Sequence, residues 1–219
     1  MESNYEKQVY MARELFQQYD RKAMIRKYGL EHDEEYLYLQ LLDQKYRIRL
    51  ETGEVERQRA DAGEQSHQVE RQTQGAYEPC IDYRAVMTIY DVLCCSGDHP
   101  VRSGVWCPLH ALQVTMSSPS ADLSTAKCAR LFAGKAGKLA EVCRRIGGVQ
   151  PQLRAGADVC WEFSVFPFFP VQLRFWDRDE EFDAKIQLLW DHNSLDFMHF
   201  ETLYYVMGIL MQRLEDMDQ

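Results

Sequence analysis

Hydrophobic and polar residues alternate along three short stretches in the last third of the chain. Residues 161–165, 171–175 and 186–190 place an apolar side chain at every second position. A period of two indicates strands with one buried face, and three such runs in close succession predict an antiparallel meander. Pro167 and Pro170 cannot donate to a central ladder, so we expect a turn or an edge crossing between the first two strands.

Apolar residues at three- and four-residue spacing predict helices elsewhere in the chain. The first helix is expected over residues 5–23, with Ser3 or Asn4 as its cap and Gly29 as its stop. The same spacing predicts further helices at 83–95, 124–132, 138–146 and 196–214. We expect the apolar stripe of the last helix, which includes Leu210, to pack against the three strands in one core.

The N-terminal half contains a second group of strands and a polar stretch. Residues 36–42 and 45–50 predict a hairpin, which either extends the meander's sheet or forms a small second sheet, and a short strand follows near Val55. Residues 57–75 are almost entirely polar. Such a segment buries too little surface to offset its ordering entropy, so we predict a mobile surface loop there. Residues 101–120 are expected to be irregular.

These elements fit a single domain over residues 1–219. The predicted fold class is α+β, an antiparallel sheet with helices packed on one face. The domain divides into an N-terminal helix and hairpin (3–56), the mobile polar loop (57–75), a helical middle (80–148) and a C-terminal sheet plus helix (158–215).

An acidic turn connects the second and third strands of the meander. Five carboxylates crowd this short segment: Asp177, Asp179, Glu180, Glu181 and Asp183. Carboxylate oxygens are preferred ligands of Ca²⁺ and Mg²⁺, although the spacing of an EF-hand is absent. The alternative is a solvated, self-repelling turn. Trp176 and Phe182 flank the turn, and we expect them to hold it against the sheet.

A second cluster follows the third strand. His192 lies beside Asp191, and a histidine next to a carboxylate can serve as a general base. No nucleophile elbow accompanies the pair, and Asn193 and Ser194 are equally well explained as turn and cap residues. The candidate functional surface therefore comprises Trp176, Asp177, Asp179, Glu180, Glu181, Asp191 and His192.

Cysteine and histidine residues offer a weak alternative metal site. The best candidates are Cys94, Cys95, Cys107 and His110, because zinc and iron–sulfur centres need thiolate or imidazole ligands. Cys107 and His110 have a workable spacing. Cys94 and Cys95, however, diverge by about 100° on a helix and cannot easily face one ion. We therefore expect the protein to hold no structural zinc or cluster, with Cys107 and His110 as weak candidates for metal ligands.

The most distinctive motifs resemble a known family. The run Trp176–Phe182, followed by Gln187–Asp191, resembles the uncharacterised prokaryotic family known as domain of unknown function 3786. The segment Phe166–Val171 and the closing amphipathic helix are similar to the same family, and the likeness is clearest from about residue 159 to residue 214. The resemblance implies the extent of the domain and a prokaryotic source, but no activity or cofactor.

Composition excludes several classes of protein. The net charge of −9 and the isoelectric point near 5.2 argue against nonspecific nucleic-acid binding and against anionic membrane surfaces. No apolar run reaches the length of a membrane span, and no signal-peptide core opens the chain. Seven cysteines without a scaffold pattern favour reduced thiols in the cytoplasm.

These observations favour a cytoplasmic, non-catalytic ligand-binding or accessory protein whose ligand, protein partner and cofactor the sequence does not identify. An enzyme is the first alternative, either hydrolase-like or metal-dependent, and it would use the acidic turn Asp177–Glu181 with His192. A thiol-based metal or redox protein is the second. The metal content of the purified protein separates the three hypotheses, because oxygen-ligand sites, thiolate sites and metal-free proteins give different results.

Overall fold

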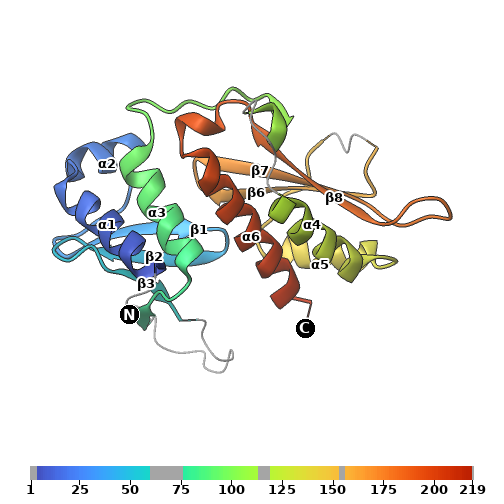
Figure 1. Cartoon of the computed structure of the whole chain (residues 1–219), viewed down its shortest axis with the longest axis horizontal. Helices are drawn as coiled ribbons and strands as arrows, with labels where there is room; N and C mark the ends of the chain where they lie inside the picture. The colour runs from blue at the N-terminus through green and yellow to red at the C-terminus, as the bar shows by residue number, and fades with distance from the viewer. Residues whose placement is uncertain (1–3, 60–75, 113–118, 153–155, 219) are drawn as a thin grey trace, which may run out of the picture.

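The chain folds into two antiparallel sheets covered by helices. The computed structural model describes residues 4–59, 76–112, 119–152 and 156–218, with only the backbone described for 119–122. Within these ranges it contains six α-helices and two four-stranded sheets, which confirms the α+β class. The two sheets lie side by side along the long axis of the molecule, and most of the helices lie in front of their strands (Figure 1).

The N-terminal sheet has the strand order β1-β2-β3-β4. Its strands are β1 (Tyr36–Leu41), β2 (Gln44–Arg49), β3 (Val55–Gln58) and β4 (Tyr77–Pro79). The predicted hairpin therefore forms a second sheet rather than extending the meander. Arg57 lies in β3 opposite Glu78, so the prediction of a loop beginning at residue 57 is wrong. Residues 60–75 of that predicted loop lie outside the described residues.

Two helices replace the single N-terminal helix that the periodicity predicted. They are α1 (Asn4–Gln18) and α2 (Arg21–Tyr28). The carboxylate of Asp20 accepts hydrogen bonds from the backbone N–H groups of Lys22 and Ala23, and this N-cap starts a new helix. Gly29 ends α2 as predicted, because its left-handed backbone, with φ of +61°, suits glycine at a helix C-terminus.

The C-terminal sheet has the strand order β5-β8-β7-β6. Its strands are β5 (Trp106–Pro108), β6 (Val159–Phe166), β7 (Phe169–Trp176) and β8 (Lys185–Asp191). The predicted meander is confirmed, while β5 lies in a segment predicted to be irregular and places Cys107 opposite Trp190. Pro170 lies within β7 rather than in the turn, and the pairing is irregular there between Ser164 and Phe166.

Four further helices pack around the sheets: α3 (Tyr83–Cys95), α4 (Pro119–Phe132), α5 (Ala136–Arg145) and α6 (Phe200–Asp216). Short 3₁₀ turns, η1 (Leu109–Ala111) and η2 (Ser194–Asp196), precede α4 and α6. The predicted bounds of α3 are confirmed, whereas α4 begins earlier than its apolar spacing indicated. The predicted helical middle also contains β5, which is a correction to the assignment of residues 80–148.

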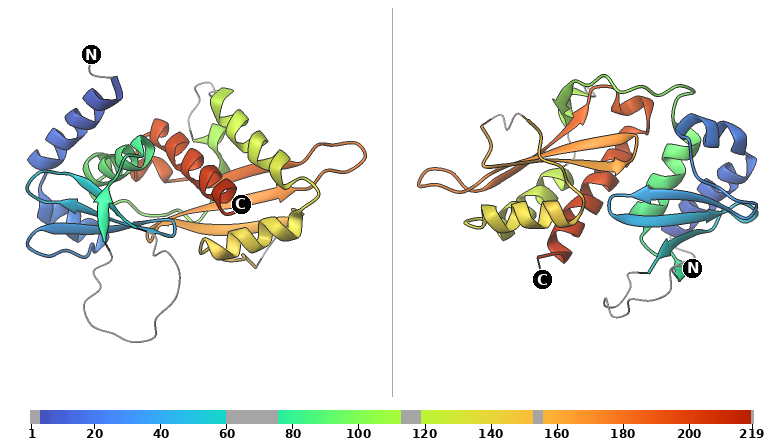
Figure 2. Two further views of the ribbon diagram at one scale, coloured as in Figure 1. Left: turned by 90° about the horizontal axis from the view of Figure 1, so that it is seen from below. Right: turned by 180° about the vertical axis from the view of Figure 1, so that it is seen from behind.

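One continuous core joins the two sheets to all six helices. Trp161, Leu173 and Leu188 from the C-terminal sheet share this core with Leu203 and Leu210 of α6, as the sequence predicted. The helices lie on the apolar face of the strands, and the view from behind shows the strands nearer the viewer than α3 and α6 (Figure 2). The opposite face of β6 and β7 carries Glu162, Ser164, Gln172 and Arg174 together with the buried Cys160.

Candidate functional site

The acidic turn forms the tip of the β7–β8 hairpin, which projects at one end of the molecule (Figure 1). Asp177 anchors its first residues: the carboxylate accepts hydrogen bonds of 2.7 Å from the Gly134 N–H and 2.8 Å from the Arg178 N–H. Asp179 accepts two further bonds from the N–H groups of Glu181 and Phe182. These bonds lower the pKa of Asp179 and explain the local shape of the turn.

The carboxylates of this turn do not converge. Within the described ranges, its residues bring no three ligand atoms within 4.8 Å of one another. Phe182 is 69% exposed, so the expectation that it holds the turn against the sheet is wrong, whereas the Trp176 indole N–H donates to the carbonyl of Gly156. Arg174 donates to Gln172 instead of to the turn. This geometry favours a solvated turn over a preformed cation site.

Asp191 and His192 lie at the opposite end of β8 from the acidic turn. Because β8 spans Lys185–Asp191, a strand rise of about 3.3 Å per residue separates the two regions by roughly 20 Å. The structure therefore does not bring all the candidate residues into one surface. His192 is exposed, and its backbone N–H pairs with the carbonyl of Val105.

The buried carboxylate of Asp191 has a structural environment. It accepts hydrogen bonds from the Ser103 N–H and hydroxyl, from the Gly104 N–H and from the Asn193 N–H. Burial favours the neutral acid, but the hydrogen bonds from Ser103, Asn193 and Gly104 outweigh it and hold the pKa of Asp191 below its usual value. Asp191 thus fixes the segment that leads into β5.

The four predicted thiol and imidazole candidates are also dispersed. Cys107 is buried in β5, and His110 is exposed in η1. Cys94 is buried in the core, while its neighbour Cys95 is exposed, so the two side chains diverge as expected. The structure brings none of these four residues together as a ligand set within its described part.

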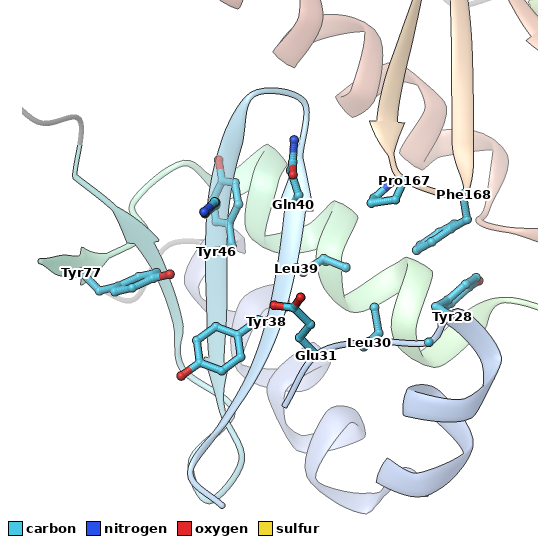
Figure 3. Close-up of a pocket in the computed structure, with 12 residues that line it drawn as sticks. Tyr28, Leu30, Glu31, Tyr38, Leu39, Gln40, Tyr46, Tyr77, Pro167 and Phe168 are labelled. Atoms are coloured by element: carbon cyan, nitrogen blue, oxygen red, sulfur yellow. The ribbon is translucent and has the colours of Figure 1, made fainter. Parts of the chain in front are cut away.

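A pocket of about 470 Å³ lies at the edge of the N-terminal sheet. Its lining comes from the end of α2, from the edge strand β1, from β2 and β4, and from the turn between β6 and β7 (Figure 3). Its size falls within the range of small-molecule sites in proteins. The lining residues are Tyr28, Gly29, Leu30, Glu31, Tyr38, Leu39, Gln40, Lys45, Tyr46, Tyr77, Pro167 and Phe168.

Parallel aromatic rings form one wall of this pocket. Tyr28 and Phe168 stack with ring centroids 3.9 Å apart and an interplanar angle of 14°, and the two rings face one another in Figure 3. Phe166 and Phe197 lie near Phe168 with their rings nearly parallel to it. Because Phe166 and Phe197 are buried, the wall is set by the core and needs no ligand to order it.

The opposite wall is the edge of strand β1. The N–H of Tyr38 donates to the Glu31 carbonyl, and the N–H of Leu42 donates to the Val165 carbonyl. Backbone groups alternate sides along an antiparallel strand, so Gln40, which lies midway, presents its N–H and C=O on the same open side. The pocket therefore contains an adjacent backbone donor and acceptor.

Three tyrosines of the pocket, Tyr28, Tyr38 and Tyr46, provide ring surface, and their hydroxyl groups already donate hydrogen bonds within the protein. Tyr38 donates to Asp33 at 2.6 Å, and Tyr46 donates to Gln44 at 2.9 Å. The hydrogen bond to Asp33 raises the pKa of Tyr38 to about 12, and burial raises that of Tyr28 to about 12. These phenols stay neutral at physiological pH.

Sequence reasoning missed this pocket. The signal available was the density of tyrosine in the predicted hairpin and the aromatic pair Phe168–Phe169 between two prolines. Neither pattern shows that the β6–β7 turn lies against the end of α2. That proximity arises from packing between segments far apart in the chain.

Comparison with known proteins gives one match. Residues 20–213 match the profile of a family described as domain of unknown function (DUF3786). No curated protein and no solved structure matches the chain. None of the described helices combines the length and the apolar character that a membrane span requires.

Proposed function

This chain belongs over residues 20–213 to the DUF3786 family, which has no assigned activity, so we propose its function from the pocket. We propose that the protein binds a planar heteroaromatic ligand in this pocket and does not transform it. The observation that carries the proposal is the stacked Tyr28–Phe168 wall facing the open edge of β1 across about 470 Å³. A flat ring presents one face to such a wall and one edge to the strand.

The backbone of Gln40 supplies specificity for the ring edge. An N–H donor and a C=O acceptor side by side match heterocycles that carry an acceptor nitrogen or a carbonyl oxygen next to an N–H or amino group. Purine, pterin and flavin rings share this edge. A buried donor or acceptor without its partner costs about 1–3 kcal/mol, so ligands that lack the pair bind more weakly.

Charges at the rim suit a ligand of low net charge. Lys45 and Glu31 both line the pocket, and both are exposed. Their opposite charges largely cancel at the rim. The net charge of −9 disfavours a nucleic-acid polymer as the source of the ring, so a free nucleoside or related compound fits better.

The pocket chemistry supports binding rather than catalysis. The hydroxyls of Tyr28, Tyr38 and Tyr46 are hydrogen-bonded within the protein, and the raised pKa values of Tyr28 and Tyr38 make both phenols poor proton donors at neutral pH. A non-catalytic, cytoplasmic role agrees with the seven cysteines, all of which lie in the described part of the chain and none of which forms a disulfide.

Binding of riboflavin and of adenosine, each measured by isothermal titration calorimetry, tests the proposal. We expect at least one to bind, and Phe168→Leu to weaken it about five- to tenfold, because a lost stacking contact is worth roughly 1–1.5 kcal/mol. Phe182→Leu is the matched control, since this exposed aromatic lies on the acidic turn and should leave binding unchanged.

An analogue tests the strand edge separately. If adenosine binds, its N6,N6-dimethyl derivative, which keeps the ring and loses the amino donor, should bind more weakly to the same protein. If neither ring binds, or if Phe168→Leu and Tyr28→Leu both leave affinity unchanged, the pocket is not the ligand site and the proposal fails.

A further inference from the structure

Three side chains of different chemistry converge where α3 ends and α6 begins. Asp91 and Cys95 are four residues apart on α3, so they share one face of the helix. His199 is the N-cap residue of α6. One potential ligand atom from each residue lies within 4.8 Å of the other two.

Asp91 is the centre of this cluster. One carboxylate oxygen lies 2.5 Å from Nδ1 of His199, and the other accepts the backbone N–H of His199 at 2.8 Å. The Cys95 sulfur lies within 4.8 Å of the ligand atoms of Asp91 and His199. The three donor atoms therefore surround one small space that a cation can occupy.

We propose that Asp91, Cys95 and His199 form a binding site for a divalent transition-metal ion of the zinc type. The set combines sulfur, nitrogen and oxygen donors, which is a combination that zinc accepts. Both helices are long elements packed against one another, so the ligands stand on a rigid frame. Cys95 and His199 are exposed, which leaves the fourth position open to water.

Only small adjustments are needed for coordination. Zinc–ligand bonds of about 2.0–2.3 Å place the ligand atoms of a tetrahedral site about 3.3–3.6 Å apart. The Asp91–His199 pair must widen from 2.5 Å, and the imidazole can rotate because its side chain is 63% exposed. The second oxygen of Asp91, held by the His199 backbone N–H, keeps the carboxylate oriented as outer contacts do in metal sites.

The thiol proton of Cys95 and a nearby positive charge both oppose binding of the ion. Cysteine coordinates metals as the thiolate, so binding releases the Cys95 proton into solvent. Lys27 lies close by, where its ammonium donates to the carbonyl and hydroxyl of Ser96. Its positive charge opposes a second cation, which keeps the site weaker than a four-ligand structural zinc centre.

This ligand set differs from the one that the sequence indicated. Cys95 belongs to both, but Cys94, Cys107 and His110 are replaced by Asp91 and His199. The site also differs from the heteroaromatic pocket, so either proposal can fail without the other.

Titration of metal-free, fully reduced protein with Co²⁺ tests the site. Cobalt substitutes for zinc and gives a thiolate-to-metal charge-transfer band in the near ultraviolet only when sulfur coordinates it. We expect this band in the unaltered protein and its loss in Cys95→Ser. His199→Asn should weaken Co²⁺ binding at least about 100-fold, because even changes to outer contacts of metal sites cost 10–100-fold.

Matched variants separate this site from the sequence-derived one. Cys107→Ser and His110→Asn should leave the band and the affinity unchanged. Added Zn²⁺ should raise the melting temperature of the unaltered protein and not that of Cys95→Ser, because an ion stabilises only the state that binds it. Asp91 also contacts the start of α6, so Asp91→Asn is informative only alongside its melting temperature without metal.

The absence of a charge-transfer band in the unaltered protein would overturn the proposal, leaving Asp91 and His199 as a structural pair between α3 and α6. A band that persists in Cys95→Ser, or that disappears in Cys107→Ser, would overturn it equally by placing the ion at another thiol.

Discussion

Tyr28 at the end of α2 stacks on Phe168 in the turn between β6 and β7, with ring centroids 3.9 Å apart. This contact joins the N-terminal helices to the C-terminal sheet and forms one wall of the pocket. We expect Phe168→Leu to lower the free energy of unfolding by about 1 kcal/mol, the scale of an aromatic stacking contact. Urea unfolding measures it. A loss above about 3 kcal/mol would show that Phe168 is a core residue rather than a pocket wall.

Leu210 tests the shared core. It is fully buried in α6, and replacing it with alanine should cost about 2–5 kcal/mol, as deletion of a buried leucine does. The exposed Leu123 is the control, because Leu123→Ala should change stability by no more than about 0.5 kcal/mol. A near-zero effect of Leu210→Ala would mean that α6 does not contribute to the folding core.

Asp191 should make stability depend on pH. The pKa of Asp191 is lower in the folded protein than in the unfolded chain, where it is near 4. The ionised carboxylate therefore adds to the free energy of unfolding at any pH above the unfolded-state pKa. This contribution is lost as the pH falls through the folded-state pKa. Asp191→Asn should cost about 1–3 kcal/mol at neutral pH, since the amide cannot accept every bond that the carboxylate accepts.

Denaturant unfolding between neutral and acidic pH checks this prediction. As the pH falls, the free energy of unfolding of Asp191→Asn should decrease less steeply than that of the unaltered protein. The exposed Asp183→Asn serves as a control and should keep the original slope. If the free energy of unfolding depended on pH equally in Asp191→Asn and in the unaltered protein, the stabilising role assigned to the Asp191 carboxylate would be contradicted.

Arg213 and Asp43 link α6 to the turn between β1 and β2. The guanidinium makes contacts of 2.6, 3.0 and 3.1 Å with the carboxylate, and both side chains are partly buried. A double-mutant cycle with Arg213→Gln and Asp43→Asn should give a coupling of about 1 kcal/mol that decreases with added salt. The Lys127–Glu215 pair should give a smaller coupling, because the Lys127 side chain is 69% exposed and that of Arg213 is 25% exposed. Equal coupling energies for the two pairs would contradict the argument from burial of the cation.

A functional role for the acidic turn remains a hypothesis, and a double variant tests it. Asp179→Asn with Glu180→Gln should leave stability unchanged or slightly higher, because asparagine keeps the acceptor for the Glu181 and Phe182 N–H groups while repulsion falls. Thermal unfolding measures stability. Loss of a ligand or partner interaction in this folded variant would instead support a functional surface at the turn.

Local patterns determined much of the fold. The alternation over 161–190 specified β6, β7 and β8, because a period of two fixes which face of a strand is buried. Helical spacing specified α3 to its correct ends, and the glycine at position 29 specified the end of α2. These features depend on residues within a few positions of one another, so one sequence displays them directly.

Tertiary structure alone decided the rest. The strands β4 and β5 have three residues each, which is too few to show a period, and their partners lie elsewhere in the chain. His199 reaches Asp91 and Cys95 only because α6 packs on α3, and Phe168 reaches Tyr28 only because the sheets share one core. The residue types were visible in the sequence, whereas their proximity depends on how distant apolar surfaces pack, which local spacing does not encode.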